Sequence, residues 1–386
     1  MKRRNFAVAA MTLLIGATTV LCARGQKATI ATPKTETIEW QPQTLTLIQE
    51  GGLYGRIHRV RNGDLLCVYA SDRIWVRRSR DEGKSWQKPV EVARWAYGNL
   101  ANAELLPLRD GSLLCFMNQR PRHPANDQNG AATPHPFAIT MSRSRDNGQS
   151  WGEPATLYSA DTNSANGCWE PTAIQLPSGE VQLFFANENP YRSSDEQEIT
   201  LMRSLDGART WSAPQTASFR AGSRDGMPTP LVLRHGRGIV VAIEDPGLSG
   251  TFKPVIVSTS MKDNWRSGVV DGKSARRWSA LQTPLSPQVY AGAPYLQQMP
   301  SGQTVLAFQQ SDDGDINHAR IVVCVGDQWA RNFAGASSPF PTQAGARQLW
   351  PSLFVKNKRT VTAICEARIN GHFGVWSIDG QLAIGR

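Results

Sequence analysis

The sequence lacks several features that would point to particular classes of protein. No stretch has a convincing helical period, and after the first 21 residues no apolar run is long enough to span a membrane. The six cysteines include no CxxC pair, and an odd number would remain after removal of an N-terminal signal, which argues against a disulfide framework. His123, His135 and His318 have no metal-ligand spacing, so no metal and no cofactor is expected.

Basic runs are also missing from most of the chain. The formal net charge is +10, yet no Lys/Arg cluster follows the first few residues, so a solvated surface is expected rather than a nucleic-acid interface. With 40% hydrophobic and 19% charged residues, the composition is that of a globular chain and excludes disorder.

The N-terminus has the pattern of a secretory signal. A basic start is followed by an apolar run that ends at Leu21 and is too short to span a membrane comfortably. We therefore predict a signal at 1–24, a Thr/Pro/Lys-rich linker at 25–37 and one domain at 38–386, in a secreted or periplasmic protein. Lipidation at Cys22 is the alternative, although bulky Leu21 stands where a small residue is expected.

Two motifs recur along the chain. The first is a turn of the form Ser-x-Asp-x-Gly-x-Ser/Thr-Trp, here called the Asp box, at Ser79–Trp86, Ser144–Trp151 and, with the glycine one place early, Ser204–Trp211. Aspartate caps the amides of the turn and glycine takes a positive φ, which is typical of a hairpin. Decayed copies surround Asp263 and Asp327. Recurring corners of this kind indicate a repeat architecture.

The second motif is a tight turn followed by an apolar strand. Six copies occur at a mean spacing of roughly 59 residues, which is enough for four short strands and their loops; they begin near Asn62, Asp110, Ser178, His235, Ser301 and Asn357. We predict an all-β fold, a six-bladed β-propeller with four-stranded antiparallel blades. Residues 37–50 are expected to supply the outer strand that completes the last blade, and a β-helix would need much shorter repeats.

In a propeller, side chains beside the first two strands of each blade surround a central depression. The candidate site residues are therefore those just before the turn that joins the first two strands of each blade, and those just after the second strand. The positions after the second strand are Asp72, Arg120, Glu188, Glu244, Gln310 and Glu366. The candidates for substrate binding are Arg56, His58, Asp72, Asn102, Trp169, Arg224, Asp225, Tyr290, Arg347 and Trp350. The alternative is that these side chains pair with one another and fill the channel.

Two glutamates among these positions suit acid–base chemistry. Glu170 stands between Trp169 and Pro171 at the start of an inner strand, a partly desolvated setting that raises a carboxyl pKa. Glu244 ends a wholly apolar strand. One protonated and one ionised carboxyl are the two groups that glycoside cleavage requires; a separation of about 5 to 5.5 Å indicates retention and about 6.5 to 9.5 Å inversion.

The Asp boxes and Gly55-Arg56-Ile57-His58 resemble the sialidase superfamily of six-bladed propellers. Sialidases use an arginine triad for the substrate carboxylate and a tyrosine nucleophile in the last blade. Here the stretch that matches the tyrosine motif is Trp350-Pro351-Ser352-Leu353, without the tyrosine, and His58 replaces the proline of the Arg-Ile-Pro motif.

A closer resemblance is to glycoside hydrolase family 93, the exo-α-1,5-L-arabinanases. It is carried by Trp169-Glu170-Pro171, by Ser223–Pro228, by the strand that ends at Glu244 and by Ala291–Pro294. This resemblance implies that Glu170 is the acid/base and Glu244 the nucleophile. It also implies that Trp169, Arg224 and Asp225 are pocket residues.

Three functions follow as hypotheses. The first is a secreted retaining exo-glycosidase that acts on arabinan or a related glycan. The second is a sialidase-type enzyme with Arg56, Arg224 and Arg347 as a carboxylate clamp. The third is a non-catalytic glycan-binding propeller, since fold does not imply function. The expected partner is an oligosaccharide or polysaccharide, with no nucleic acid and no membrane span, and the protein is expected to be a monomer.

Overall fold

The computed structural model describes residues 36–122, 134–342 and 347–384. The predicted signal, Cys22, nearly all of the linker and His123 lie outside these residues. Within the described ranges all regular structure is β-strand or short 3-10 helix, and no helix is long and apolar enough to cross a bilayer. The five 3-10 helices are η1 (Pro42–Thr44), η2 (Ser164–Asn166), η3 (Arg234–Gly236), η4 (Pro246–Leu248) and η5 (Ile316–His318).

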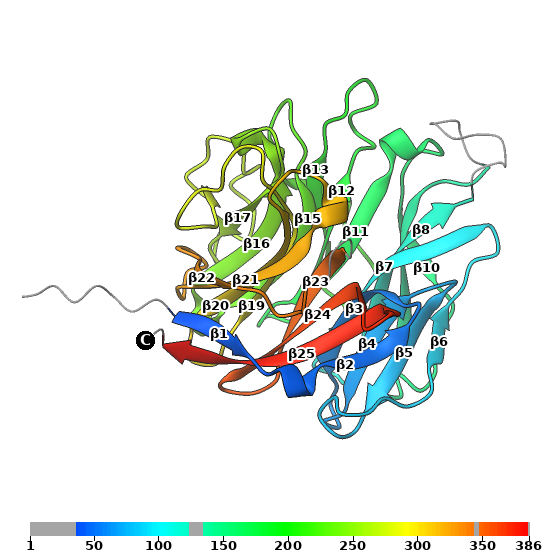
Figure 1. Cartoon of the computed structure of the whole chain (residues 1–386). Helices are drawn as coiled ribbons and strands as arrows, with labels where there is room; N and C mark the ends of the chain where they lie inside the picture. Colours follow the sequence, from blue (N-terminus) through cyan, green and yellow to red (C-terminus); the bar gives the residue numbers. More distant parts are fainter. Residues whose placement is uncertain (1–35, 123–133, 343–346, 385–386) are drawn as a thin grey trace, which may run out of the picture. The chain divides into compact units, whose positions relative to one another are not determined.

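The strands form six antiparallel sheets, each taken as one blade and numbered along the chain (Figure 1). Blade 1 contains β3 (Leu53–Arg59), β4 (Leu65–Ala70), β5 (Ile74–Ser79) and β6 (Val90–Ala93). Blade 2 contains β7 (Gly98–Pro107), β8 (Leu113–Pro121), β9 (Ala138–Ser144) and β10 (Ala155–Ser159). Blade 3 contains β11 (Cys168–Gln175), β12 (Val181–Asn187), β13 (Glu198–Ser204) and β14 (Gln215–Ser218).

The second half of the ring repeats this order. Blade 4 contains β15 (Gly226–Leu233), β16 (Gly238–Asp245), β17 (Lys253–Thr259) and β18 (Arg277–Ser279). Blade 5 contains β19 (Tyr290–Gln298), β20 (Thr304–Ser311), β21 (Arg320–Gly326) and β22 (Ala334–Ser337). Blade 6 contains β23 (Gln348–Val355), β24 (Thr360–Ile369) and β25 (His372–Ile384), together with β1 (Glu36–Trp40) and β2 (Thr46–Glu50). The predicted six-bladed propeller is confirmed.

The ring closes by joining the two ends of the chain. Both β1 and β2 pair with β25, so the blue and red strands lie side by side in Figure 1. The prediction of an outer strand within 37–50 is confirmed, with the refinement that η1 divides this segment into two strands. The first strand of each blade contacts the first strands of both neighbouring blades, so six inner strands surround the axis of the ring.

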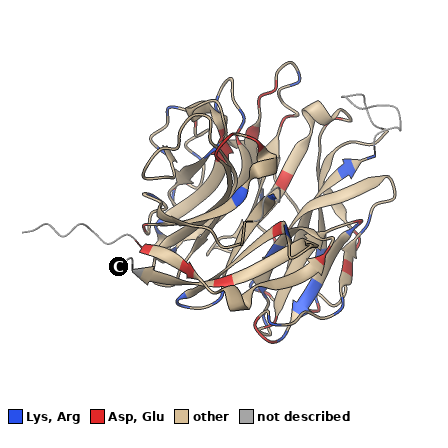
Figure 2. Cartoon of the chain, viewed as in Figure 1, with Lys and Arg blue, Asp and Glu red and all other residues tan. Residues whose placement is uncertain are grey.

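Apolar clusters between neighbouring blades form the core. One such cluster joins Val68 of blade 1 to Leu105 and Cys115 of blade 2. The five cysteines in the described residues are all buried and free. In the view of Figure 2, acidic and basic residues are interspersed over the strands and loops, which agrees with a solvated surface.

The Asp boxes join the third and fourth strands of blades 1, 2 and 3. In the second box, Asp146 Oδ1 accepts hydrogen bonds from the Ser144 hydroxyl at 2.8 Å and the Ser150 amide at 2.9 Å. Asp263 accepts equivalent bonds from the Thr259 hydroxyl and the Ser267 amide in blade 4, so the decayed copy keeps the geometry. These aspartates therefore set the outer corners of the blades.

Candidate active site

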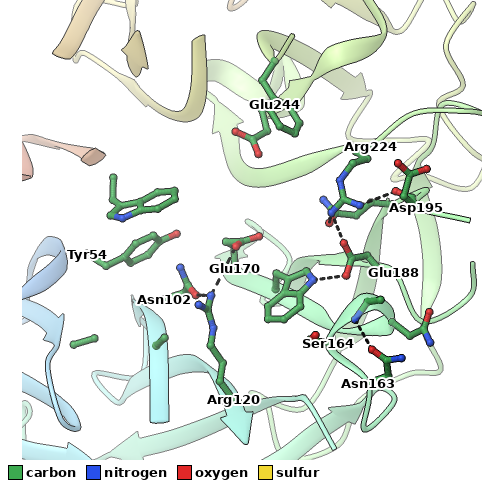
Figure 3. A pocket seen from close by; sticks show the side chains of 18 of the residues that line it. Tyr54, Asn102, Arg120, Asn163, Ser164, Glu170, Glu188, Asp195, Arg224 and Glu244 are labelled. Atoms are coloured by element: carbon green, nitrogen blue, oxygen red, sulfur yellow. Dashed lines mark hydrogen bonds and ion pairs between the residues drawn. The ribbon is translucent and has the colours of Figure 1, made fainter. Parts of the chain in front are cut away.

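A cavity of about 1450 Å³ lies among the inner strands and adjoining loops. Figure 3 shows the side chains that line it, with Glu170 and Glu244 among them. Ten residues predicted from the sequence belong to the lining: Asn102, Arg120, Trp169, Glu170, Glu188, Arg224, Glu244, Arg347, Trp350 and Glu366. The cavity is large enough for several sugar units, since pockets for small ligands are usually about 300 to 1,000 Å³.

Every inner strand carries a β-bulge at the same place. The register shifts at this point in all six pairs of first and second strands. In each bulge a non-glycine residue adopts a left-handed conformation with φ between 47° and 55°; these residues are Tyr54, Asn102, Glu170, Met227, Ala293 and Trp350. Left-handed backbone in a non-glycine residue is unfavourable, and such strain concentrates at functional sites. The bulges re-aim one side chain per blade.

The six bulge residues divide into apolar and polar members. Tyr54, Met227 and Ala293 pack in one apolar cluster with Trp350 against them. Asn102 and Glu170 are polar and belong to the adjacent blades 2 and 3. Glu170 is thus the one carboxylate in this strained ring.

Glu170 is partly buried and has no hydrogen bond within the described part of the chain; its side chain is 18% exposed. Its nearest cationic group is Arg120, whose Nη2 lies 4.0 Å from Oε1 of Glu170. Burial raises the pKa of Glu170 to about 8, with Glu244 and Glu188 adding to the shift, while Arg120 and Arg224 oppose it. At neutral pH this carboxyl is therefore mostly protonated.

Glu244 stands near the end of β16, opposite Gly226 of β15. Its Oε2 accepts a hydrogen bond of 2.7 Å from the amide of Ala293, the bulge residue of blade 5. Burial raises the pKa of Glu244 to about 7, while the Ala293 amide and the Arg224 guanidinium oppose the shift. Because these two groups favour the charged form, Glu244 ionises before Glu170.

Two glycines allow the Glu244 carboxylate to fit. A Cβ added at Gly226 would lie 2.9 Å from Oε1 of Glu244, and one added at Gly292 would lie 2.7 Å from Oε2. Real Cβ contacts are essentially never this short. The Ser223–Pro228 and Ala291–Pro294 stretches thus each contribute a glycine against this carboxylate.

Trp169, Glu188 and Arg224 form one connected wall of the cavity. The Trp169 indole N–H donates to Glu188 Oε2 at 2.8 Å, and Arg224 donates to the other oxygen of Glu188. Arg224 also donates to the backbone carbonyl of Asp195 at 2.6 Å (Figure 3). Arg224 is therefore already neutralised by a carboxylate.

Arg56 and His58 lie outside the cavity lining. Glu104 Oε1 is 2.6 Å from His58 Nε2, and Glu104 Oε2 is 3.6 Å from Arg56 Nε. The Arg56 guanidinium also lies 3.7 Å from the centre of the Tyr54 ring. For these two residues the structure has the alternative arrangement, in which inner-strand side chains pair with one another.

Asp72 and Asp225 are also placed away from the cavity. Asp72 lies in the exposed turn after β4, where it accepts hydrogen bonds from Trp75 and Arg73. Asp225 is fully buried and pairs with Arg277, which also pairs with Asp245. Both carboxylates have local structural partners and do not face the proposed substrate site.

Tyr290 borders the site without lining the cavity. Its hydroxyl accepts a hydrogen bond of 2.7 Å from Gln309, and burial raises its pKa. A Cβ at Gly292 would meet the Tyr290 hydroxyl at 2.5 Å and Glu244 at 2.7 Å, so both groups adjoin the same glycine. Tyr290 thus lies beside the Glu244 carboxylate.

The sequence reasoning missed two loops that line the cavity. One is η2, whose Asn163 caps it by accepting from the Ala165 amide, and the other is 192–195 after β12. Tyr54, Gln197 and Phe252 also line the cavity and were not predicted. The Asn-Ser-Ala-Asn stretch before Gly167 is a turn signal in the sequence, but nothing in that signal indicates which side of the blade the loop covers. The described residues contain no group of three or more potential metal ligands.

The solved structures that resemble this chain share its fold at low sequence identity. An α-L-arabinanase from Penicillium chrysogenum, complexed with arabinobiose, is 17% identical with a TM-score of 0.60, covering 91% of this chain and 98% of the arabinanase. A family 93 α-L-arabinofuranosidase from Fusarium graminearum, also with arabinobiose, is 17% identical with a TM-score of 0.61 and the same coverage. A Hadza microbial sialidase is 13% identical with a TM-score of 0.57, covering 86% of this chain and 66% of the sialidase.

A search of curated proteins found no significant match. Residues 136–293, from the end of blade 2 into β19, match the family model described as a BNR repeat-like domain. This segment contains two of the three Asp boxes and both Glu170 and Glu244. Part of the chain thus resembles a BNR repeat-like domain, and the whole six-bladed propeller is similar in fold to arabinanase, arabinofuranosidase and sialidase structures.

Proposed function

We propose that the protein is a glycoside hydrolase, and specifically a retaining exo-glycosidase that cleaves arabinan or a related neutral glycan. The observation that carries the proposal is the pair of carboxyls in one cavity, Glu170 and Glu244, whose pKa values are raised to different extents. Two titratable groups held at different pKa values in one site are the usual basis for separate acid and base roles. The arabinan substrate and the exo mode rest on the likeness to the arabinanases.

In the proposed mechanism Glu170 and Glu244 act in sequence. Protonated Glu170 gives its proton to the glycosidic oxygen while the Glu244 carboxylate attacks the anomeric carbon, so the bond to the leaving sugar breaks as the glycosyl ester forms. Ionised Glu170 then removes a proton from water, and the water oxygen displaces Glu244 from the anomeric carbon. The Ala293 amide, which donates to Glu244, holds that carboxylate in place.

The charge of the cavity favours a neutral substrate over sialic acid. The three arginines of the hypothetical carboxylate clamp do not converge as free cations. Arg56 lies outside the lining beside Glu104, and Arg224 is paired with Glu188. Arg347 lines the cavity with Glu366, whose pKa it lowers against the effect of burial. We also propose, from residues 1–24, that the enzyme is exported from the cytoplasm.

The decisive experiment tests Glu244 as the nucleophile. Glu244→Gln is expected to abolish turnover of arabinobiose with little loss of binding. Glu244→Ala with azide is expected to release glycosyl azide of inverted configuration, and proton NMR of the wild-type reaction should show product of retained configuration first. Unchanged hydrolysis by Glu244→Gln would eliminate it as the nucleophile, and release of sialic acid from a reporter glycoside would support the sialidase hypothesis instead.

A further inference from the structure

Glu366 occupies the same place in blade 6 that Glu244 occupies in blade 4. In every blade one residue of the second strand pairs with the residue that precedes the bulge. Around the ring these positions hold Ala70, Asn118, Ala186, Glu244, Gln309 and Glu366. Two of the six are therefore carboxylates, and both line the cavity.

In blades 4 and 5 the side chain at this position holds the bulge of the next blade. Glu244 accepts from the amide of Ala293 at 2.7 Å, and Gln309 accepts from the amide of Trp350 at 2.8 Å. The backbone amide of Tyr54 likewise interacts with Glu366 and lowers its pKa, so the pattern continues from blade 6 to blade 1, where the ring closes. A neutral glutamine performs this structural task in blade 5, so the task does not require a negative charge.

The contact with the Tyr54 amide leaves one oxygen of the Glu366 carboxylate without a hydrogen bond. The residue is 4% exposed, and its Oε2 is shielded from solvent and has no hydrogen-bond partner among the residues that the structure describes. Burial raises the pKa of Glu366 to about 7, while Arg347, the Tyr54 amide and Arg56 oppose the shift. Leaving a buried carboxylate oxygen without a partner is costly, and such groups in folded proteins call for a specific explanation.

Glu366 shares the cavity lining with apolar and aromatic residues of blades 6 and 1. These are Trp350, Phe373 and Leu53, and Arg347 of the same lining is the cation that acts most on Glu366. Aromatic faces pack against the C–H groups of sugar rings, while a few polar groups fix the orientation of such a ligand. An aromatic wall with one unsatisfied carboxylate therefore has the composition of a sugar-binding subsite.

We propose that Glu366 is a substrate-binding carboxylate that accepts a hydrogen bond from a hydroxyl of a neutral glycosyl unit seated against Trp350. The inference rests on the proposed function and extends it, since it names a second subsite and its anchor. Because Oε2 is shielded in the free protein, the side chain rotates towards the cavity when the hydroxyl arrives. Glu366 binds in this scheme and takes no part in bond cleavage.

The test is calorimetric titration of arabinobiose at pH 8, where Glu366 is mostly ionised. The measurements use Glu170→Gln as the background, so that the sugar is not consumed. Glu366→Gln keeps an acceptor for the Tyr54 amide, as Gln309 does for Trp350, and removes only the charge. The expected result is an affinity about 5- to 10-fold lower, because a charged acceptor makes a hydrogen bond roughly twice as strong as a neutral one.

Glu180→Gln in the same background is the matched control. Glu180 is also a buried glutamate, paired with Arg203 at 2.6 Å, but it does not line the cavity. The protein with both Glu180→Gln and Glu170→Gln is expected to bind arabinobiose as tightly as Glu170→Gln alone. Thermal unfolding of each variant verifies that the propeller is intact.

The outcomes separate the two proposals. If Glu366→Gln binds arabinobiose as tightly as the background, or if Glu180→Gln is weakened equally, the role of Glu366 is overturned even where the wild type cleaves the sugar. If the wild type binds arabinobiose without cleaving it and Glu366→Gln binds more weakly, hydrolysis is overturned and the subsite is supported. A wild type that neither binds nor cleaves the sugar would overturn both.

Discussion

Carboxylates occur in two contrasting settings in this propeller, the outer Asp-box corners and the inner-strand bulges. Burial raises the pKa of Asp146, but hydrogen bonds from Ser150, Ser144 and the Gln149 amide outweigh it and lower the pKa to about 2. Burial raises the pKa of Glu170 to about 8, and no hydrogen bond within the described residues compensates. The Asp146 carboxylate in an outer turn thus has hydrogen-bond partners, whereas the Glu170 carboxyl at the centre accepts no hydrogen bond from the described residues.

This contrast separates the turns that stabilise the blades from the carboxyls to which we assign the proposed chemistry. The Asp boxes are the most recognisable stretches of the sequence, yet they lie at the turns between the third and fourth strands. Glu170 and Glu244 occur without an obvious motif of their own but occupy strained or tightly enclosed positions. The most recognisable repeats of the sequence therefore lie in the outer turns, away from the cavity that contains Glu170 and Glu244.

After loss of the proposed nucleophile, the largest effect is expected from removing the acid. Glu170→Gln should lower kcat/KM for arabinobiose by about 10²- to 10⁴-fold, the usual contribution of general acid catalysis. A dinitrophenyl glycoside should lose far less, because its leaving group needs no proton. Steady-state kinetics with both substrates provides the measurement, with Glu180→Gln as control. Equal losses on the two substrates would contradict the role of Glu170 as an acid.

A methyl group beside Glu244 should have the next largest effect. In Gly292→Ala the new Cβ would lie 2.7 Å from Oε2 of Glu244 and 2.5 Å from the Tyr290 hydroxyl, so the carboxylate must move. Displacing a reacting group by about 1 Å costs on the order of 10²-fold in rate. Gly152→Ala, whose Cβ meets only a backbone oxygen at 3.6 Å, should retain wild-type kcat/KM. Normal activity in Gly292→Ala would show that Glu244 is not constrained there.

At the rim, the expected effect is on stability alone. Asp146→Ala removes the acceptor for the Ser144 hydroxyl and the Ser150 amide, which should lower the free energy of unfolding by about 1 to 2 kcal/mol. The activity of the folded fraction should be unchanged. Urea unfolding followed by tryptophan fluorescence, together with kcat/KM, measures both quantities. A loss of kcat/KM without a loss of stability would contradict the assignment of Asp146 to stability alone.

The smallest effect is a difference in pH dependence. The pKa of Glu170 is raised from 4.5 to about 8 in the folded state, so the folded protein binds more protons than the unfolded chain between these values, and stability falls as pH rises. Relative to the wild type, Glu170→Gln should therefore become more stable as pH rises from 4.5 towards 8, and the two proteins should differ little at pH 4. Asp146 has a lowered pKa, so its contribution is lost only as pH falls below its ordinary 3.8. Parallel stability profiles for wild type and Glu170→Gln would contradict this assignment.

Much of the fold could be predicted from the sequence because propeller blades repeat local signals. The Asp boxes and the six turn–strand motifs fix the number of blades and the order of strands, and the strand content of 37–50 indicates the closure. The inner-strand bulges left no such signal. A bulge inserts one residue and shifts the pairing that follows, so counting along a strand gives the wrong register.

Strand register explains part of what the site prediction missed. Counting gave Asp72 and Gln310, which do not line the cavity, whereas the second-strand positions paired beside the bulges in blades 1 and 5 are Ala70 and Gln309. The count was correct in blades 4 and 6, which contain Glu244 and Glu366. Ion pairing explains the rest, since nothing in the sequence indicates that Arg277 would neutralise Asp225, or Glu104 hold His58.

The closure of blade 6 has a consequence for how the protein reaches this state. Residues 36–50 are synthesised before any of blades 1 to 5, but their partner strand β25 spans His372–Ile384, so the ring stays open until β25 has been made. Contacts so distant in sequence form slowly, because a very long loop must close. A nascent chain can complete blades 1 to 5 and still lack its seam. We therefore expect the pairing of β1 and β2 with β25 to be the last step of folding and the place where unfolding begins.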